Sequence, residues 1–124
     1  MTRQTFRLTL ASLALAVSGA IAAPAAVAHS HLVAAAPAPR GIVAPPRTIS
    51  LRFSEPLEPR FSGFEVKDGA GKAVATAVHA EGADNEVLVG TPAAPLTPGA
   101  YTIAWHLVAK DGHRMQGAYP FTVH

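Results

Sequence analysis

A short motif near the end of the chain carries two metal-ligand types. Asp111 and His113 stand on either side of Gly112, and side chains at positions i and i+2 fall on the same side of an extended chain. The glycine lets the backbone bend, so that the carboxylate and the imidazole can meet on one ion. An Asp-Gly turn between two strands explains the same residues without a metal. The motif alone leaves both interpretations open.

The first 28 residues have the order of a secretory signal peptide. Arg3 and Arg7 precede an apolar run, and the segment ends in Ala26-Val27-Ala28, the kind of small residues that a signal peptidase recognises. The apolar run is shorter than the ~20 residues that a membrane-spanning helix needs. The sequence therefore predicts a cleaved leader at 1–28 and a mature domain at 29–124.

Cleavage after Ala28 would turn His29 into a chelating terminus. Its α-amine and its imidazole Nδ1 can close a six-membered ring on one ion, and the amine has a reference pKa of about 8, so a metal displaces its proton readily. Nitrogen donors in a plane suit Cu(II) or Ni(II), with copper favoured. His31 offers a rival site, in which the amine, two deprotonated amides and its imidazole wrap the ion. A terminus without any function is the remaining alternative.

Composition excludes several other classes of protein. The chain has no Cys, which rules out disulfides, thiolate nucleophiles, zinc ribbons and blue-copper sites. Its formal charge of +2 comes from ten basic and eight acidic residues, and Arg3 and Arg7 account for the excess. The mature chain is formally neutral and lacks the basic patch of a nucleic-acid binder. All six His residues remain in it.

Pro and Gly punctuate the mature chain every 8 to 12 residues, which is typical of an all-β sandwich or barrel. About seven strands are expected, at 32–36, 47–53, 61–67, 74–79, 86–89, 100–109 and 118–123. The clearest is 100–109, where alternation predicts that Trp105 faces the core with its neighbours Tyr101, Ile103 and Leu107. The other predicted core residues are Phe53, Phe61, Phe64 and Phe121, whereas Tyr119 is placed outside the core. The histidines expected to face away from the core or to be structural are His79, His106 and His124.

Several segments together resemble the CopC family of periplasmic copper-resistance and copper-binding proteins. They are the mature start HSHLVAAAP at 29–37, LRFSEPLEPRFSG at 51–63, PLTPGAYTIAW at 95–105, and the Asp111-Gly-His113 motif followed by Gly117. They occur in order and cover essentially the whole mature chain. The resemblance implies a small Greek-key β-barrel or sandwich, with immunoglobulin-like or cupredoxin-like topology.

The same resemblance implies one Cu(II) per mature chain, bound in the periplasm. His29 would supply amine and imidazole, His113 a second imidazole, and Asp111 an oxygen, while Glu55 would orient a ligand or tune the charge. Some members carry a Met-rich loop that binds Cu(I), but Met115 is the only methionine of this mature chain. We therefore expect no separate Cu(I) site.

The predicted function is sequestration, delivery or resistance: a copper-binding protein and not an enzyme. The resemblance implies a CopD-type inner-membrane copper transporter as partner. Two alternatives remain open. One is a copper oxygenase that uses a histidine brace, and the other is an immunoglobulin-like interaction domain without metal.

Overall fold

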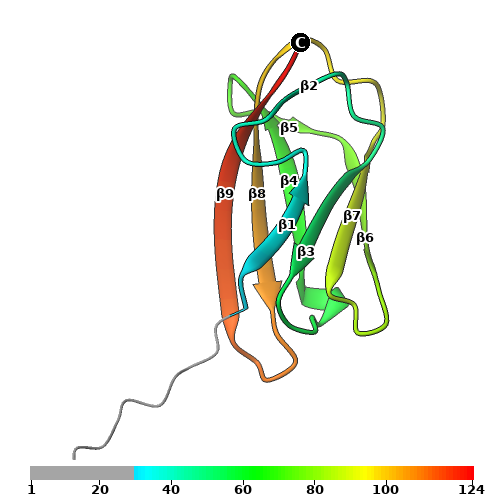
Figure 1. The fold of residues 1–124 in the computed structure, drawn as a ribbon, viewed down its shortest axis with the longest axis vertical. Coiled ribbons are helices and arrows are strands. Elements are labelled where there is room, and N and C mark those ends of the chain that lie inside the picture. The colour runs from blue at the N-terminus through cyan, green and yellow to red at the C-terminus, as the bar shows by residue number, and fades with distance from the viewer. Residues whose placement is uncertain (1–29) are drawn as a thin grey trace, which may run out of the picture.

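The computed structural model describes residues 30–124. The predicted leader and His29 lie outside the described residues. The strands form two sheets that face each other (Figure 1). In sheet order, the first contains β1 (Leu32–Ala36), β3 (Ile49–Phe53), β7 (Val87–Pro92) and β6 (Thr76–Glu81), and the second contains β2 (Ile42–Val43), β9 (Arg114–Val123), β8 (Gly99–Val108), β4 (Gly63–Asp68) and β5 (Ala73–Val74). The predicted all-β sandwich is confirmed.

The core lies between the two sheets and follows the period-two alternation of the strands. On β8, Tyr101, Ile103 and Leu107 are buried as predicted, while His106 between them is exposed. β8 pairs with β9 over its whole length and with all of β4. The strand with the clearest alternation is thus the centre of the larger sheet, and its lower end leads into the turn that carries Asp111 and His113.

Two of the nine described strands are short: β2 was not predicted, and β5 contains only the first residue of the strand expected at 74–79. β2 pairs in parallel with the end of β9, and β5 pairs with β4. The single strand expected at 74–79 is divided, because the chain leaves the five-stranded sheet after Val74 and joins the other sheet at Thr76. The alternation continues across this change of sheet, so the sequence pattern does not reveal it.

The prediction that Phe61 belongs to the core is wrong. Its side chain is 62% exposed. Residues Pro59–Phe61 form a short 3-10 turn, closed by the N–H of Phe61 donating to the carbonyl of Glu58 at 3.1 Å, and β4 begins only at Gly63. Pro59 has no N–H to give to a strand ladder, which favours a turn here. The other three predicted core phenylalanines are buried.

Trp105 is only partly buried, although it packs against the core as predicted. Its ring meets Phe53 edge-on, with centroids 5.2 Å apart, and it covers Gly117 on the neighbouring strand. A Cβ at Gly117 would overlap the indole ring. The absence of a side chain at Gly117 therefore lets the indole lie directly against β9.

Placing Tyr119 outside the core was also wrong. It is 6% exposed, and its hydroxyl donates to the carbonyl oxygen of Pro37 at 2.9 Å. Burial raises the pKa of the phenol well above its usual value. This bond ties the segment after β1 to β9, over 82 positions of sequence. Such a contact has no local signature.

We expect Tyr119→Phe to lower the free energy of unfolding by about 1 kcal/mol or somewhat more, because the buried Pro37 carbonyl loses its donor. Urea denaturation measures the change. Tyr101→Phe is the matched control: its hydroxyl donates to Thr97 at 2.7 Å in a partly buried position, where water can replace it. An equal or larger loss in the control would contradict the assignment.

The turn between β6 and β7 holds a partly buried carboxylate, that of Glu86, in its ionised form. The backbone N–H groups of Glu86 itself and of Asp84 lower the pKa of Glu86 from its usual 4.5, and Arg52 adds a weaker attraction. The Asp84 N–H donates to Oε2 at 3.0 Å, and Arg52 Nη1 lies 3.8 Å from Oε1. The ionised carboxylate of Glu86 therefore accepts the hydrogen bonds that hold this turn together.

This lowered pKa predicts a pH dependence of stability. Folding favours the ionised Glu86, so its contribution is present above the usual pKa of 4.5 and is lost as the pH falls through the lower folded pKa. In thermal melts between about pH 6 and pH 3, Glu86→Gln should depend less steeply on pH than the parent. Identical slopes would contradict this.

Candidate metal centre

The turn between β8 and β9 brings Asp111 and His113 into contact. Oδ2 of Asp111 lies 2.7 Å from Nδ1 of His113, and Oδ1 accepts the backbone N–H of His113 at 3.0 Å. The turn is closed by the N–H of Gly112 donating to the carbonyl of Ala109 at 2.9 Å, and Gly112 has a φ of +90° that favours glycine. The carboxylate of Asp111 and the imidazole of His113 therefore meet, as their i, i+2 spacing predicts. Their contact is compatible with a structural turn and with a pair of metal ligands.

The hydrogen bonds of this turn keep the carboxylate charged. The backbone N–H of His113 and then its side chain lower the pKa of Asp111 from its usual 3.8. An ionised carboxylate and an imidazole are both good ligands for a divalent ion. Both side chains are about half exposed, so an ion can reach them from solvent.

The distance between the two donors fits a metal ion. Bonds of about 2.0 Å at right angles place neighbouring ligands of a square plane about 2.8 Å apart. The Asp111 and His113 atoms are 2.7 Å apart. An ion bound to both atoms would lie beside the line that joins them and would replace the hydrogen bond, with one oxygen and one nitrogen already spaced as neighbouring ligands.

A second segment, residues 54–62, packs against this turn. Leu57 is fully buried and forms an isolated bridge with Ala109. The carbonyl of Pro56 accepts the N–H of Lys110 at 3.3 Å, and farther along Ser62 Oγ accepts the N–H of Val108 at 3.0 Å. Glu55 lies two residues before Leu57 in this segment and is partly buried.

The same segment holds the start of the described chain. The backbone N–H of His31 donates to Ser54 Oγ at 3.0 Å, and the Ser54 N–H donates to the His31 carbonyl at 2.9 Å. Leu32 pairs with Phe53, and Ser30 is almost completely buried. The chain therefore enters β1 at the end of the sandwich where the β8–β9 turn lies (Figure 1).

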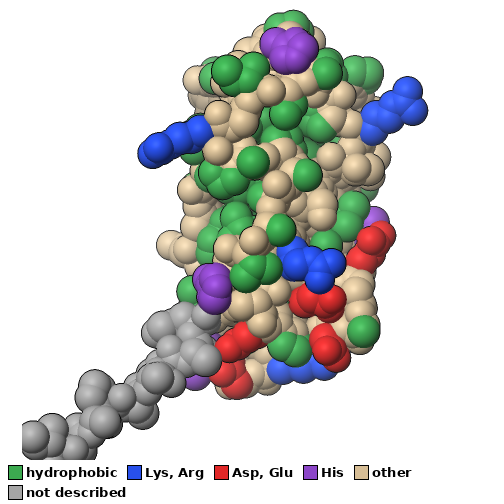
Figure 2. Space-filling view, viewed as in Figure 1, with side chains coloured by type: hydrophobic (Ala, Val, Ile, Leu, Met, Phe, Trp, Pro, Cys, Tyr) green, Lys and Arg blue, Asp and Glu red, His purple; other side chains and the backbone are tan. Residues whose placement is uncertain are grey.

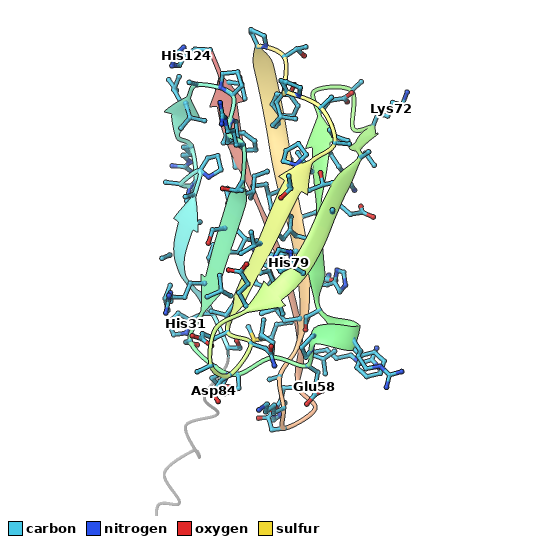
Figure 3. The ribbon with its side chains drawn as sticks, turned by 90° about the vertical axis from the view of Figure 1, so that its right-hand side faces the viewer. His31, Glu58, Lys72, His79, Asp84 and His124 are labelled. Carbon is cyan, nitrogen blue, oxygen red and sulfur yellow. The ribbon has the colours of Figure 1, made fainter. Side chains whose placement is uncertain are left out.

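This end of the sandwich is also acidic. Figure 2 shows acidic side chains gathered toward the lower part of the visible face. Six of the eight carboxylates of the chain lie in the segments that meet there: Glu55, Glu58, Glu81, Asp84, Glu86 and Asp111. Figure 3 places His31, Glu58 and Asp84 at this end and Lys72 and His124 at the other. The same segments also carry Arg52, Arg60, Lys110 and Arg114, so the carboxylates are in excess by two, which favours the approach of cations.

The structure thus brings some of the candidate ligands from the sequence into contact and leaves others apart. Asp111 and His113 are in contact, and Glu55 and His31 lie in segments joined to their end of the sandwich. His29 lies outside the described residues. Within residues 30–124, no group of three or more His, Asp or Glu side chains is arranged to hold a metal ion. Sequence reasoning also missed Ser54 and Leu57, which join the N-terminal segment to the turn.

One family model matches nearly all of the described residues. The family model described as the CopC domain matches residues 32–124, three quarters of the chain. This chain belongs to the CopC family. The match covers β1 through β9 and includes Asp111 and His113. It leaves His29 and His31 just outside.

Curated relatives of the CopC family agree. Copper resistance protein C of Xanthomonas campestris pv. juglandis is 32% identical over 121 residues, covering 93% of this chain and 95% of the relative. Copper resistance protein C of Pseudomonas syringae pv. tomato is 36% identical over 116 residues, covering 88% and 91%. Protein YobA of Escherichia coli K12 is 36% identical over 102 residues, covering 81% and 82%.

Solved CopC structures have the same sandwich. CopC from Methylosinus trichosporium OB3b matches with a TM-score of 0.70 at 33% identity, covering 77% of this chain and 93% of that one. PcoC from Escherichia coli, a methionine-rich copper resistance protein, also has a TM-score of 0.70, at 37% identity, covering 78% and 100%. In residues 30–124 of this CopC chain, no helix is long and apolar enough to cross a membrane.

Proposed function

We propose that this CopC-family protein binds copper for sequestration, delivery or resistance, with one Cu(II) held tightly per mature chain. The ligands would be the amine and imidazole of His29, the imidazole of His113 and a carboxylate oxygen of Asp111. The observation that carries the proposal is the 2.7 Å contact of Asp111 and His113, at the end of the sandwich where the chain enters β1.

The donor chemistry supports Cu(II) over other ions. Three nitrogens and one carboxylate oxygen favour a borderline ion with square-planar preference, and Cu(II) is the tightest binder of its row. Asp111 is held ionised by the turn, so it needs no deprotonation when the ion arrives. Binding would still weaken in acid, because the amine and the imidazoles then compete for protons.

The hydrogen bonds of His31 argue against the amide-wrapped alternative. In that arrangement the backbone nitrogen of His31 loses its proton and binds the ion. Here its N–H donates to Ser54 Oγ at 3.0 Å, and wrapping the ion would break this bond and the start of β1. The folded site needs no such change. We therefore propose that His31 lies beside the site and is not a ligand.

We propose that the protein acts in the periplasm and exchanges copper with an inner-membrane transporter. The leader predicted at 1–28 would carry the chain to the periplasm and expose the His29 amine on cleavage. By family resemblance, copper would be exchanged with a CopD-type inner-membrane transporter. Unlike PcoC, which is described as methionine rich, the mature chain offers only Met115, so we propose no methionine-based Cu(I) site.

Electron paramagnetic resonance of Cu(II) added to the processed protein tests the ligand set. We expect an axial spectrum with three coupled nitrogens, and mass spectrometry should give a chain that begins at His29. Four nitrogens that disappear in His31→Ala would instead identify the wrapped tail and overturn the proposed site. Copper-dependent oxidation of a polysaccharide with ascorbate would identify the oxygenase alternative, and absence of copper uptake would favour the metal-free domain.

A further inference from the structure

Strand β6 carries a second pair of metal ligands that the CopC site does not use. β6 is an edge strand, and its exposed side chains alternate with partly buried ones. His79 and Glu81 both lie on the exposed side, two positions apart, as Asp111 and His113 do. Figure 3 looks toward this side of the sandwich and places His79 on β6, between the two ends of the molecule.

The two side chains are already spaced for one ion. Nε2 of His79 lies 2.7 Å from Oε1 of Glu81, the same distance as in the Asp111 and His113 pair. Neighbouring ligands in a square plane of about 2.0 Å bonds stand about 2.8 Å apart. An ion bound to both atoms would lie beside the line that joins them, and the proton that they share would move to the other ring nitrogen or to water.

The charges around this pair favour a cation. The turn that follows β6 adds Asp84 and Glu86 to the carboxylate of Glu81, and the nearest cation identified by contact is Arg52, 3.8 Å from Glu86. Three carboxylates of this segment therefore stand against one guanidinium, which contacts Glu86 alone among them. The excess negative charge raises the local concentration of divalent ions.

The position of the pair leaves room for other ligands. The side chains are 56% and 57% exposed, and on β7 their directly opposite partners are the apolar Val89 and Val87. Within residues 30–124 no third His, Asp or Glu joins them to form a larger group. Two protein donors completed by water bind less tightly than the four donors proposed at the β8–β9 turn.

We propose that His79 and Glu81 form a second, weaker Cu(II) site on the edge strand β6. It is separate from the proposed ligands His29, Asp111 and His113 and does not depend on cleavage of the leader. The protein then takes up two copper ions, one tightly at the turn and one in fast exchange on β6. The second ion increases the amount of copper that each molecule carries.

A titration of the processed protein with Cu(II), followed by electron paramagnetic resonance and isothermal calorimetry, tests this site. The parent should bind a second equivalent with a spectrum of one coupled nitrogen. His79→Ala should abolish that equivalent, and Glu81→Gln should weaken it roughly tenfold or more. His124→Ala, which removes an exposed histidine at the opposite end, is the matched control and should bind both equivalents as the parent does.

The His113→Ala variant separates this inference from the proposed function, because it should lose the tight equivalent and keep the weak one. A parent that binds only one equivalent overturns the inference. A second equivalent that survives in His79→Ala also overturns the inference. The same holds for a second equivalent that is lost in His31→Ala and kept in His79→Ala. A second equivalent that is lost in His79→Ala, weakened in Glu81→Gln and unchanged in the control supports it.

Discussion

Replacing His113 by Ala is expected to weaken Cu(II) binding more than a hundredfold. Loss of a partner that only orients a ligand typically costs about ten- to a hundredfold in metal affinity, and loss of a ligand itself should cost more. The variant removes the imidazole and leaves Asp111 as a single oxygen donor at the turn. Because His113 is half exposed, its removal should leave the fold intact, as circular dichroism would show.

His106→Ala is the matched control for His113→Ala. His106 lies on the neighbouring strand β8, is exposed, and faces Gly63 on β4 and Gln116 on β9. Competition with a chromogenic chelator measures both affinities at the same pH. If the two variants bind alike, the turn does not hold the copper.

The amine of His29 is tested in the same assay by adding one glycine before it. The extra residue moves the amine away from the imidazole, so the six-membered chelate ring is lost while every side chain remains. We expect a loss comparable to that in His113→Ala. Parent-like affinity in both variants would exclude the proposed ligand set as a whole.

Local patterns account for most of what the sequence predicted. The alternation on β8 depends only on the direction of neighbouring side chains, and it identified the buried face of that strand correctly. The contact between Asp111 and His113 is likewise local, since the two residues are separated by one glycine. A pattern of this kind can be recognised before the fold is known.

The parts that were missed depend on contacts between distant residues. Tyr119 is buried because the segment after β1 crosses over it, and Phe61 is exposed because Pro59 starts a turn before β4. The contacts of Ser54 with His31 and of Leu57 with Ala109 span 23 and 52 positions. Only the packing of both sheets brings these residues together, so neither composition nor periodicity indicates them.

These long-range contacts connect the core to the proposed metal centre through Phe53. Its ring is 2% exposed and meets Trp105 edge-on at 5.2 Å. Its backbone pairs with Leu32 of β1, and Ser54, which holds His31, is the next residue. A cavity at Phe53 would therefore loosen β1 at the point where the chain reaches the metal-binding end.

Phe53→Ala is expected to lower the free energy of unfolding by about 3–5 kcal/mol, the usual cost of removing a buried aromatic ring. A domain of this size melts about 4–8 °C lower for each kcal/mol lost, so the melting temperature should fall by more than about 12 °C. The fluorescence of Trp105, the only tryptophan, should shift to longer wavelength as its ring gains water. Thermal melts and emission spectra of the metal-free protein measure both effects.

Two further variants make this prediction specific. Val33→Ala removes a side chain of β1 that is 50% exposed and should change stability by less than about 0.5 kcal/mol. A loosened β1 should also lower the copper affinity of Phe53→Ala. Phe53→Leu fills most of the cavity and should recover part of both the melting temperature and the copper affinity. If Phe53→Ala is destabilised but binds copper as tightly as the parent while folded, then β1 does not transmit core packing to the site, and the Ser54–His31 hydrogen bonds are sufficient to hold it.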